Sequence, residues 1–231
     1  MLIAGLQKTT LVDFPGHVAS TIFTGGCNYR CPYCQNSDLV LHPEEVTPYT
    51  EEEIFDHLKK RKSVLTGVCI SGGEPTLQPD LADFIQKVKA LGLAVKLDTN
   101  GSNPDVLKSL VAEGLLDYVA MDIKHSRAKY ASVACCPSFS LDAVTESVDF
   151  LKEGHVDYEF RTTLVKELHK ESDITAIGLW LMGAKAYYLQ PYRDSETVIS
   201  PGYHAHSREE LDTFVKILSA FLPKVEIRGD Y

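Results

Sequence analysis

The chain has 231 residues, of which 44% are apolar and 24% are charged, and its formal net charge is −9 at pH 7. This length and composition are typical of a globular protein that buries a proper core as one large domain or two small ones. The negative charge argues against a protein that wraps nucleic acid, which needs a cationic face. No apolar run approaches the roughly 18 residues of a membrane span, and the N-terminus lacks the pattern of a signal peptide. Six cysteines are too few for a disulfide scaffold, so we expect a cytoplasmic protein without membrane or nucleic-acid partners.

Apolar runs typical of buried strands alternate with segments of helical spacing along the chain. Residues 1–18, with a turn signal at Pro15-Gly16, are expected to form a β-hairpin or an extra strand pair. The strand-like runs that follow are 20–24, 67–71, 93–98, 118–123, 158–165 and 186–191. Helical spacing is found in 81–88, 144–151 and 211–218, and 171–182 is apolar enough for a further helix. Capping-box patterns at Thr50 with Glu53 and at Ser207 with Glu210 indicate two helix starts.

A strand followed by a helix, repeated about six times, implies parallel strands joined by right-handed crossovers. Six units are too few for a closed eightfold barrel, so we expect an α/β fold with an open or partial (β/α)6 barrel. One domain would cover 1–231, with an N-terminal hairpin at 1–18 and the barrel at 19–231. In such folds chemistry collects at the carboxyl ends of the strands. Polar and glycine-rich segments do follow the apolar runs: GGC, GGEP, TNG, KH and PYRD.

Three cysteines follow the first of these runs, with the spacing Cys27-x3-Cys31-x2-Cys34. The Gly25-Gly26 pair before them lets the backbone turn sharply and approach a bulky group. Three thiolates on one short loop favour a 4Fe–4S cluster with one iron left without a protein ligand. A small molecule could bind and be reduced at that iron, whereas a cluster with four cysteine ligands is an electron carrier.

A structural zinc site is the alternative for these cysteines. Such a site needs four ligands, usually as two pairs, and no second pair is present. Cys69 lies in an apolar run, and Cys135 and Cys136 are adjacent. His42 or a more distant histidine could still complete a zinc site.

The cysteine spacing, with the aromatic Tyr33 before the last cysteine, resembles the signature of the radical S-adenosylmethionine (SAM) superfamily. The order of the other motifs extends the resemblance along nearly the whole chain. It implies a 4Fe–4S cluster held by Cys27, Cys31 and Cys34, with SAM bound to the fourth iron and Tyr33 beside the cofactors. The implied reaction is reductive cleavage of SAM to methionine and a 5′-deoxyadenosyl radical.

The segment Gly72-Gly73-Glu74-Pro75 follows the second barrel strand. Its glycines expose backbone amides and carbonyls, and Glu74 offers a carboxylate to an ammonium group. A plain glycine turn that caps a helix is the alternative reading. In the resembled superfamily this element contacts the amino group of SAM.

Two acidic strand ends follow. Asp98-Thr99-Asn100-Gly101 could be an Asn-Gly turn, but a carboxylate at the end of a central strand needs a partner. Asp122 and Lys124 lie on one side of the next strand end and could form a simple salt bridge. In the glycyl-radical-enzyme activases, a branch of the superfamily, these elements position SAM, its carboxylate and, in some members, a monovalent cation. The resemblance therefore assigns Asp98, Thr99, Asn100, Asp122 and Lys124 to cofactor binding.

The fifth barrel strand has an unexpected polar face. Alternation places Glu159, Arg161 and Thr163 on one side. They could form a buried Glu–Arg pair, or Arg161 could bind the SAM carboxylate, as guanidinium geometry allows and the activases suggest. Gln190 is a weaker candidate for the same pocket, and His125 is expected at the surface.

The stretches Val12–Gly16 and Thr24–Cys27 resemble the activating proteins of anaerobic (class III) ribonucleoside-triphosphate reductases. Only 37 residues separate Cys34 from Gly72, too few for the two-cluster insert of some activases. The resemblance implies flavodoxin or ferredoxin as reductant and a glycyl radical enzyme as partner, which would contact segments such as 36–49, 125–137 and 192–206. The alternatives are a small-molecule enzyme like 7-carboxy-7-deazaguanine synthase, an iron–sulfur electron carrier and a zinc-stabilised binding module.

Overall fold

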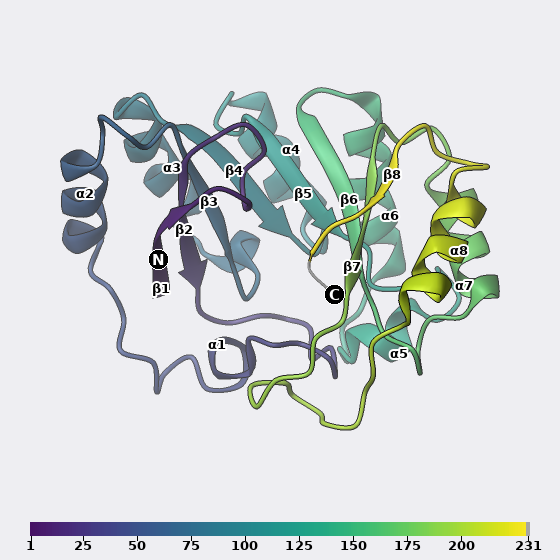
Figure 1. The fold of residues 1–231 in the computed structure, drawn as a ribbon. Coiled ribbons are helices and arrows are strands. Elements are labelled where there is room, and N and C mark those ends of the chain that lie inside the picture. Colours follow the sequence, from purple (N-terminus) through teal and green to yellow (C-terminus); the bar gives the residue numbers. More distant parts are fainter. Residues whose placement is uncertain (230–231) are drawn as a thin grey trace.

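The structure is a computed structural model that describes residues 1–229 of the chain. Within them eight strands form one sheet in sequence order, with β1 antiparallel to β2 and every later pair parallel (Figure 1). The strands are β1 (Ile3–Thr10), β2 (Ala19–Thr24), β3 (Gly67–Gly72), β4 (Ala94–Thr99), β5 (Tyr118–Asp122), β6 (Asp157–Leu164), β7 (Tyr187–Pro191) and β8 (Val225–Ile227). The predicted partial barrel of parallel strands is confirmed.

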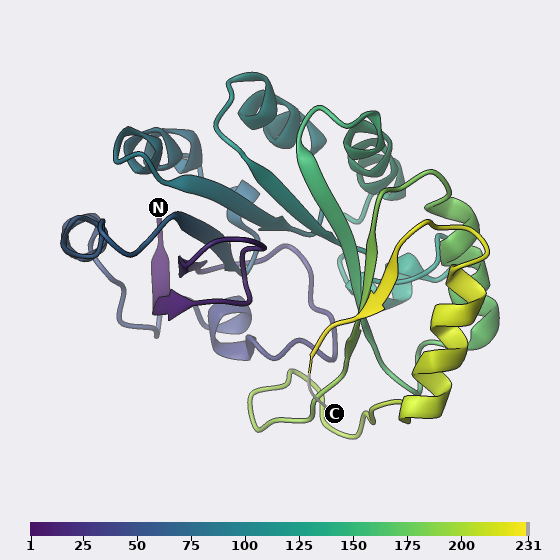
Figure 2. The same ribbon diagram turned by 45° about the horizontal axis from the view of Figure 1, so that its top comes forward.

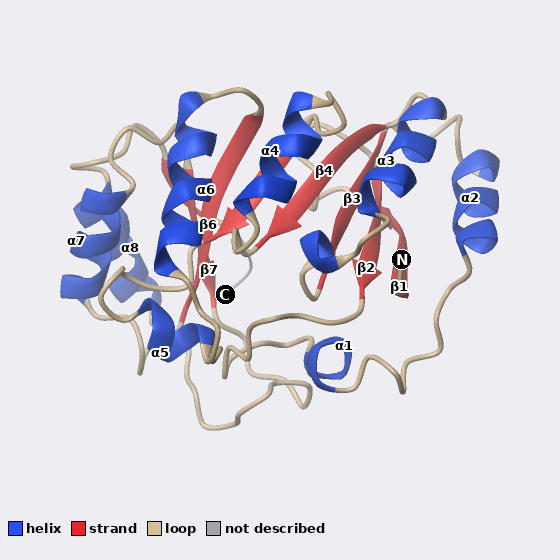
Figure 3. Cartoon of the chain, turned by 180° about the vertical axis from the view of Figure 1, so that it is seen from behind, coloured by secondary structure: helices blue, strands red, loops and turns tan. Residues whose placement is uncertain are grey.

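The longer helices lie on the convex side of this sheet, which curves as an arc in Figure 2. Figure 3 shows α3, α4 and α6 over the outer face of the middle strands. The helical elements are α1 (Ser37–Leu41), α2 (Glu51–Lys60), the 3₁₀ turn η1 (Pro75–Leu77), α3 (Leu81–Ala90), α4 (Pro104–Ala112), α5 (Tyr130–Ala134), α6 (Leu141–Glu153), α7 (Glu171–Trp180) and α8 (Arg208–Leu218). No helix among the described residues is long and apolar enough to cross a membrane.

Local sequence signals start two of these helices as predicted. Thr50 and Glu53 exchange hydrogen bonds at the start of α2, and Ser207 and Glu210 do the same at α8. These bonds occupy amide groups that have no partner inside the helix. The predicted helix at 171–182 is α7.

The predicted N-terminal hairpin is formed by β1 and β2, so its second strand is also the first strand of the barrel. The segment that joins them closes the amino end of the barrel. Phe14 is buried there against Gly67, where an added Cβ would stand 2.8 Å from the Phe14 ring. Asp13 Oδ2 accepts a hydrogen bond from Thr21 Oγ1 at 2.5 Å.

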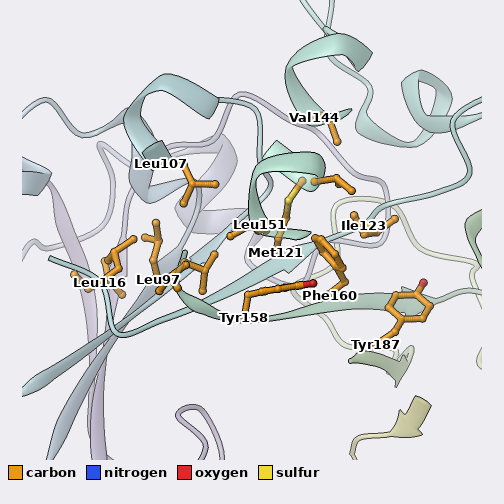
Figure 4. Close-up of a cluster of buried hydrophobic side chains, with 14 of the residues drawn as sticks. Leu97, Leu107, Leu116, Met121, Ile123, Val144, Leu151, Tyr158, Phe160 and Tyr187 are labelled. Atoms are coloured by element: carbon orange, nitrogen blue, oxygen red, sulfur yellow. The ribbon is translucent and has the colours of Figure 1, made fainter. Parts of the chain in front are cut away.

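The apolar core lies between the sheet and the helices. Figure 4 shows its central part, where Leu97, Met121 and Phe160 of three neighbouring strands meet Leu107 and Leu151 of the covering helices. All five side chains are buried. The opposite face of the same strands is polar and leads to the loops at their carboxyl ends, which lie near α1 and α5 along the lower edge of Figure 1.

Candidate active site

A cavity of about 890 Å³, counting the part that opens to solvent, lies at the carboxyl ends of the strands. The three clustered cysteines and Tyr33 line it from one side. Residues at or near the ends of β3 to β6 also line it: Ser71, Gly72, Gly73, Asp98, Thr99, Asn100, Asp122, Lys124, Arg161 and Thr163. The remaining lining residues come from the cysteine loop and α1: Tyr29, Gln35, Asn36 and Val40.

The cysteine loop is held by backbone contacts from distant parts of the chain. Glu74 N donates to Gly26 O at 2.8 Å, and Gly73 packs so closely on Gly26 that any Cβ there would clash. On the other side, Ile199 N donates to Cys34 O at 3.1 Å and Ser200 N to Pro32 O at 2.8 Å. The segment 193–200 therefore holds the cysteine loop through backbone hydrogen bonds, and we call this contact the clasp.

The thiols are free and partly or fully buried. Burial raises the pKa of Cys27 to about 11, with a further contribution from the Glu74 carboxylate. Burial also raises the pKa of Cys31 to about 12. Both are therefore neutral thiols at pH 7 unless a metal binds and displaces their protons.

The three cysteine sulfurs are not arranged as the ligands of a single zinc ion would be. Within residues 1–229, only the exposed His42, Glu44 and Glu45 bring three possible ligand atoms within 4.8 Å of one another. The three cysteine sulfurs are thus spread more widely than around one zinc ion, where bonds of about 2.3 Å keep sulfurs roughly 4 Å apart. A four-iron cluster spans more space, so the donor set fits the predicted group.

Glu74 is fully buried, and its carboxylate faces the loops instead of the cavity. Oε1 accepts hydrogen bonds from Thr76 N at 3.1 Å, Thr76 Oγ1 at 2.5 Å and Thr99 Oγ1 at 2.7 Å, while Oε2 accepts one from Asn100 N at 2.7 Å. Burial raises the pKa of Glu74, and these bonds offset part of that shift. Glu74 thus ties two strand-end loops together, and the backbone of Gly72 and Gly73 lines the cavity. Contact between the Glu74 carboxylate and an ammonium group stays a prediction.

Five charged side chains form a network, and all of them except Lys96 line the cavity. Arg161 lies between two carboxylates, with Nε 2.5 Å from Asp122 Oδ1 and NH2 3.1 Å from Asp98 Oδ2. Lys124 Nζ is 2.9 Å from Asp122 Oδ2, and the buried Lys96 pairs with Asp98. Three cations thus face two carboxylates, which leaves one positive charge in the network.

These pairs favour the ionised forms of Asp98, Asp122, Lys124 and Arg161. Burial would raise the pKa of Asp122, but Arg161 and Lys124 hold it well below its usual range. Burial likewise favours a neutral Lys124, yet Asp122 keeps its pKa well above the ordinary value. The network is therefore charged across the working pH range.

Glu159 has a partner that the sequence did not reveal. Its carboxylate, fully buried, receives Arg228 NH1 at 2.5 Å and NH2 at 2.9 Å, and Tyr118 OH at 2.9 Å. A buried Glu–Arg pair does exist, but with Arg228 after β8 and not with Arg161. Arg161 is left to face Asp98 and Asp122.

Three of the predicted cofactor-binding residues are not part of the cavity lining, and their roles stay predictions. The lining, within the described chain, does not include Glu74, Pro75 or Gln190. His125 is buried, not at the surface as expected: its Nε2 lies 3.0 Å from Leu168 O and its ring stacks on His169. Lys96, which completes the charge network, was missed, although a lysine two residues before Asp98 in an apolar strand was a signal for it.

Comparisons with known proteins agree with this geometry. The profile of the radical SAM superfamily matches residues 21–176. The chain is 32% identical over 233 residues to a protein of Methanocaldococcus jannaschii provisionally named a glycyl-radical enzyme activating enzyme, covering 98% of this chain and 95% of that protein. It is 33% identical over 130 residues to the pyruvate formate-lyase-activating enzyme of Clostridium pasteurianum, covering 53% and 52%, and 26% identical over 244 residues to the 7-carboxy-7-deazaguanine synthase of Methanopyrus kandleri, covering 94% and 88%.

A solved structure confirms the architecture. SuiB of Streptococcus suis superposes with a TM-score of 0.72 over 91% of this chain and 49% of SuiB, at 12% sequence identity, which speaks for the fold alone. The superfamily implies a 4Fe–4S cluster and SAM, and the three thiols that share one cavity are suited to them. The chain belongs to the radical SAM superfamily and, within it, to the family of glycyl-radical enzyme activating enzymes.

Proposed function

We propose that the chain cleaves SAM in this cavity and installs a glycyl radical on an anaerobic ribonucleoside-triphosphate reductase. The observation that supports it most directly is the shared cavity, in which three thiols of one loop face a network with one uncompensated positive charge. A ligand with a carboxylate beside a metal-binding amino group would match both parts. When bound, the cluster and SAM supply one-electron cleavage of a carbon–sulfur bond and a 5′-deoxyadenosyl radical.

The residues of the chain would bind and orient SAM. Arg161 and Lys124 offer guanidinium and ammonium groups to its carboxylate, since each is already fixed by Asp122. Gly72 and Gly73 lack side chains and present their backbone to its amino group. These groups are in place before SAM arrives, so little reorganisation is needed during the reaction.

A monovalent cation beside SAM is a further part of the proposal. Asp98 and Asp122 are the carboxylates that would hold it, and each now has two cationic partners. A cation would therefore replace one of these contacts. Turnover measured in potassium, sodium and choline salts tests this: equal rates in all three would contradict it.

The choice of reductase as partner is supported by the resemblance of Val12–Gly16 and Thr24–Cys27 to the reductase activating proteins. Residues 12–16 lie at the amino end of the barrel, opposite the cavity, so they would identify the branch without contacting the partner's glycine. Flavodoxin or ferredoxin is the proposed reductant.

The test is an anaerobic activation assay. The reconstituted protein, SAM and a reductant are incubated with an anaerobic ribonucleoside-triphosphate reductase, and the glycyl radical is measured by electron paramagnetic resonance (EPR). Pyruvate formate-lyase is assayed in parallel. A radical on the reductase supports the proposal, whereas a radical only on pyruvate formate-lyase, or none despite SAM cleavage, contradicts it.

A second candidate is 7-carboxy-7-deazaguanine synthesis, because a synthase of that name aligns over 94% of this chain. It would use the same cavity for a small molecule in place of a polypeptide. Formation of a deazaguanine product, detected by mass spectrometry, together with no radical on either enzyme, would favour it.

A further inference from the structure

The sulfur of Cys27 receives hydrogen bonds that the other two clustered cysteines lack. Tyr29 N donates to Cys27 Sγ at 3.4 Å, and the side-chain Nδ2 of Asn100 donates to the same sulfur at 3.9 Å. Within residues 1–229, no hydrogen bond reaches the sulfur of Cys31 or Cys34. The three sulfurs therefore have unequal surroundings.

Asn28, in the cysteine loop itself, holds the Asn100 amide in this position. Asn28 Oδ1 accepts from Asn100 Nδ2 at 2.9 Å, and Asn28 Nδ2 donates to Ser102 Oγ at 2.9 Å. Ser102 N in turn donates to Asn100 Oδ1 at 2.9 Å. Both ends of the Asn100 amide are thus occupied, which keeps its nitrogen toward Cys27.

Burial strengthens this arrangement. Asn100 is 5% exposed, so water does not compete for its amide. The Asn100 backbone is fixed as well, because its N–H donates to the buried Glu74 carboxylate. The side chain therefore has little freedom to turn away from the sulfur.

Hydrogen bonds to the sulfurs are one of the factors that set the reduction potential of an iron–sulfur cluster. They withdraw electron density from the thiolate, which stabilises the reduced state and raises the potential. We propose that Asn28 is a positioning residue that aims the Asn100 amide at Cys27 and thereby raises the reduction potential of the cluster. This inference rests on cluster binding at the three cysteines and is independent of the partner enzyme.

The test compares the reconstituted variants Asn28→Ala, Asn100→Ala and the double variant, without SAM or partner. The midpoint potential of the cluster is measured by EPR-monitored redox titration. Asn100→Ala should shift it to a more negative value, and Asn28→Ala should shift it in the same direction by no more. The double variant should shift the potential no further than Asn100→Ala does, because the two substitutions act on the same hydrogen bond, the one from Asn100 to Cys27.

Asn103→Ala is the matched control. Asn103 Nδ2 donates to Thr76 Oγ1 at 2.9 Å in the same group of loops, with no bond to a cysteine sulfur. The midpoint potential of the cluster in Asn103→Ala should equal that of the wild-type protein. An unchanged potential in Asn100→Ala, additive shifts in the double variant or an equal shift in Asn103→Ala would overturn the proposal.

A measurement on the wild-type protein covers the case in which the variants bind no cluster. Side-chain ¹⁵N-labelled asparagine should give a nitrogen coupling to the reduced cluster in electron–nuclear double resonance. Its absence would also overturn the proposal. Because neither measurement uses SAM or a reductase, a failed activation assay leaves this result intact.

Discussion

The two faces of the barrel strands differ in how they are held together. On β6, Tyr158 and Phe160 lie buried under the helices, while Glu159 and Arg161 alternate with them on the inner face. The outer face depends on burial of apolar area, whereas the inner face depends on ion pairs that are individually poor contributors to stability. The difference indicates that the outer face mainly stabilises the fold, whereas the inner face mainly forms the binding site. Mutations on the outer face should therefore change stability, and mutations on the inner face should also change ligand binding.

The largest expected effect is at the cysteine loop. Cys31→Ala removes one of three protein ligands and should abolish the brown chromophore and SAM cleavage together. Absorption spectroscopy under anaerobic conditions and chromatography of 5′-deoxyadenosine measure the two. Cys135→Ser, an exposed cysteine outside the cavity, should retain both. Cleavage that survives in Cys31→Ala would refute the assignment.

On the outer face, Phe160→Ala should lower the free energy of unfolding by about 3–5 kcal/mol through the cavity that it leaves. Denaturant unfolding of the apoprotein measures this loss. The folded fraction should still bind a cluster, because Phe160 does not reach the cavity. Leu179→Ala, at a side chain that is 54% exposed, should change the stability by under about 0.5 kcal/mol. Equal losses from both variants would contradict the comparison.

On the inner face, Arg161→Met should cost about 3 kcal/mol of stability, at the low end for a broken buried ion pair. The loss of stability is limited because each carboxylate retains another ion pair: Asp98 with Lys96, and Asp122 with Lys124. SAM affinity, measured by equilibrium dialysis with the reconstituted protein, should fall as well. Arg228→Met is the control: it breaks the pair with Glu159 outside the cavity and should lower stability with SAM affinity intact. Unchanged SAM affinity in Arg161→Met would argue against its proposed role.

The smallest expected effect is a pH dependence of cluster loading. Burial raises the pKa values of Cys27 and Cys31 to about 11 and about 12, so cluster binding must release their protons. Loading against a competing chelator should therefore improve from pH 7 to 9. In the apoprotein the same shifts stabilise the fold below pH 9 and are lost as the pH rises toward 11 and 12. Loading that is independent of pH would contradict the raised values.

Much of the fold could be predicted because alternation and apolar runs are local. The six predicted barrel strands match β2 to β7 to within one residue at either end. β8 was missed because Val225–Ile227 is too short to show a pattern, and it is a strand only because β7 lies beside it. The partner of β1 likewise depends on pairing, which no local pattern reveals.

The site was predictable where residue type and spacing determine chemistry. The cysteines and the charged strand ends do meet in one cavity. The partners of these groups were not predictable, because Arg228 reaches Glu159 across 69 residues and Glu74 turns toward loops whose closure depends on the whole barrel. His125 is buried because His169 and Leu168 cover it, a contact between two loops.

The clasp of residues 193–200 over the cysteine loop has a consequence for biosynthesis. Pro32 and Cys34 are translated early, yet Ser200 and Ile199, which hold their carbonyls, emerge from the ribosome some 165 residues later. A nascent chain that ends at β7 lacks this clasp. Iron–sulfur delivery should therefore act after residues 199–200 have been synthesised, because earlier loading would meet a loop that lacks these two hydrogen bonds.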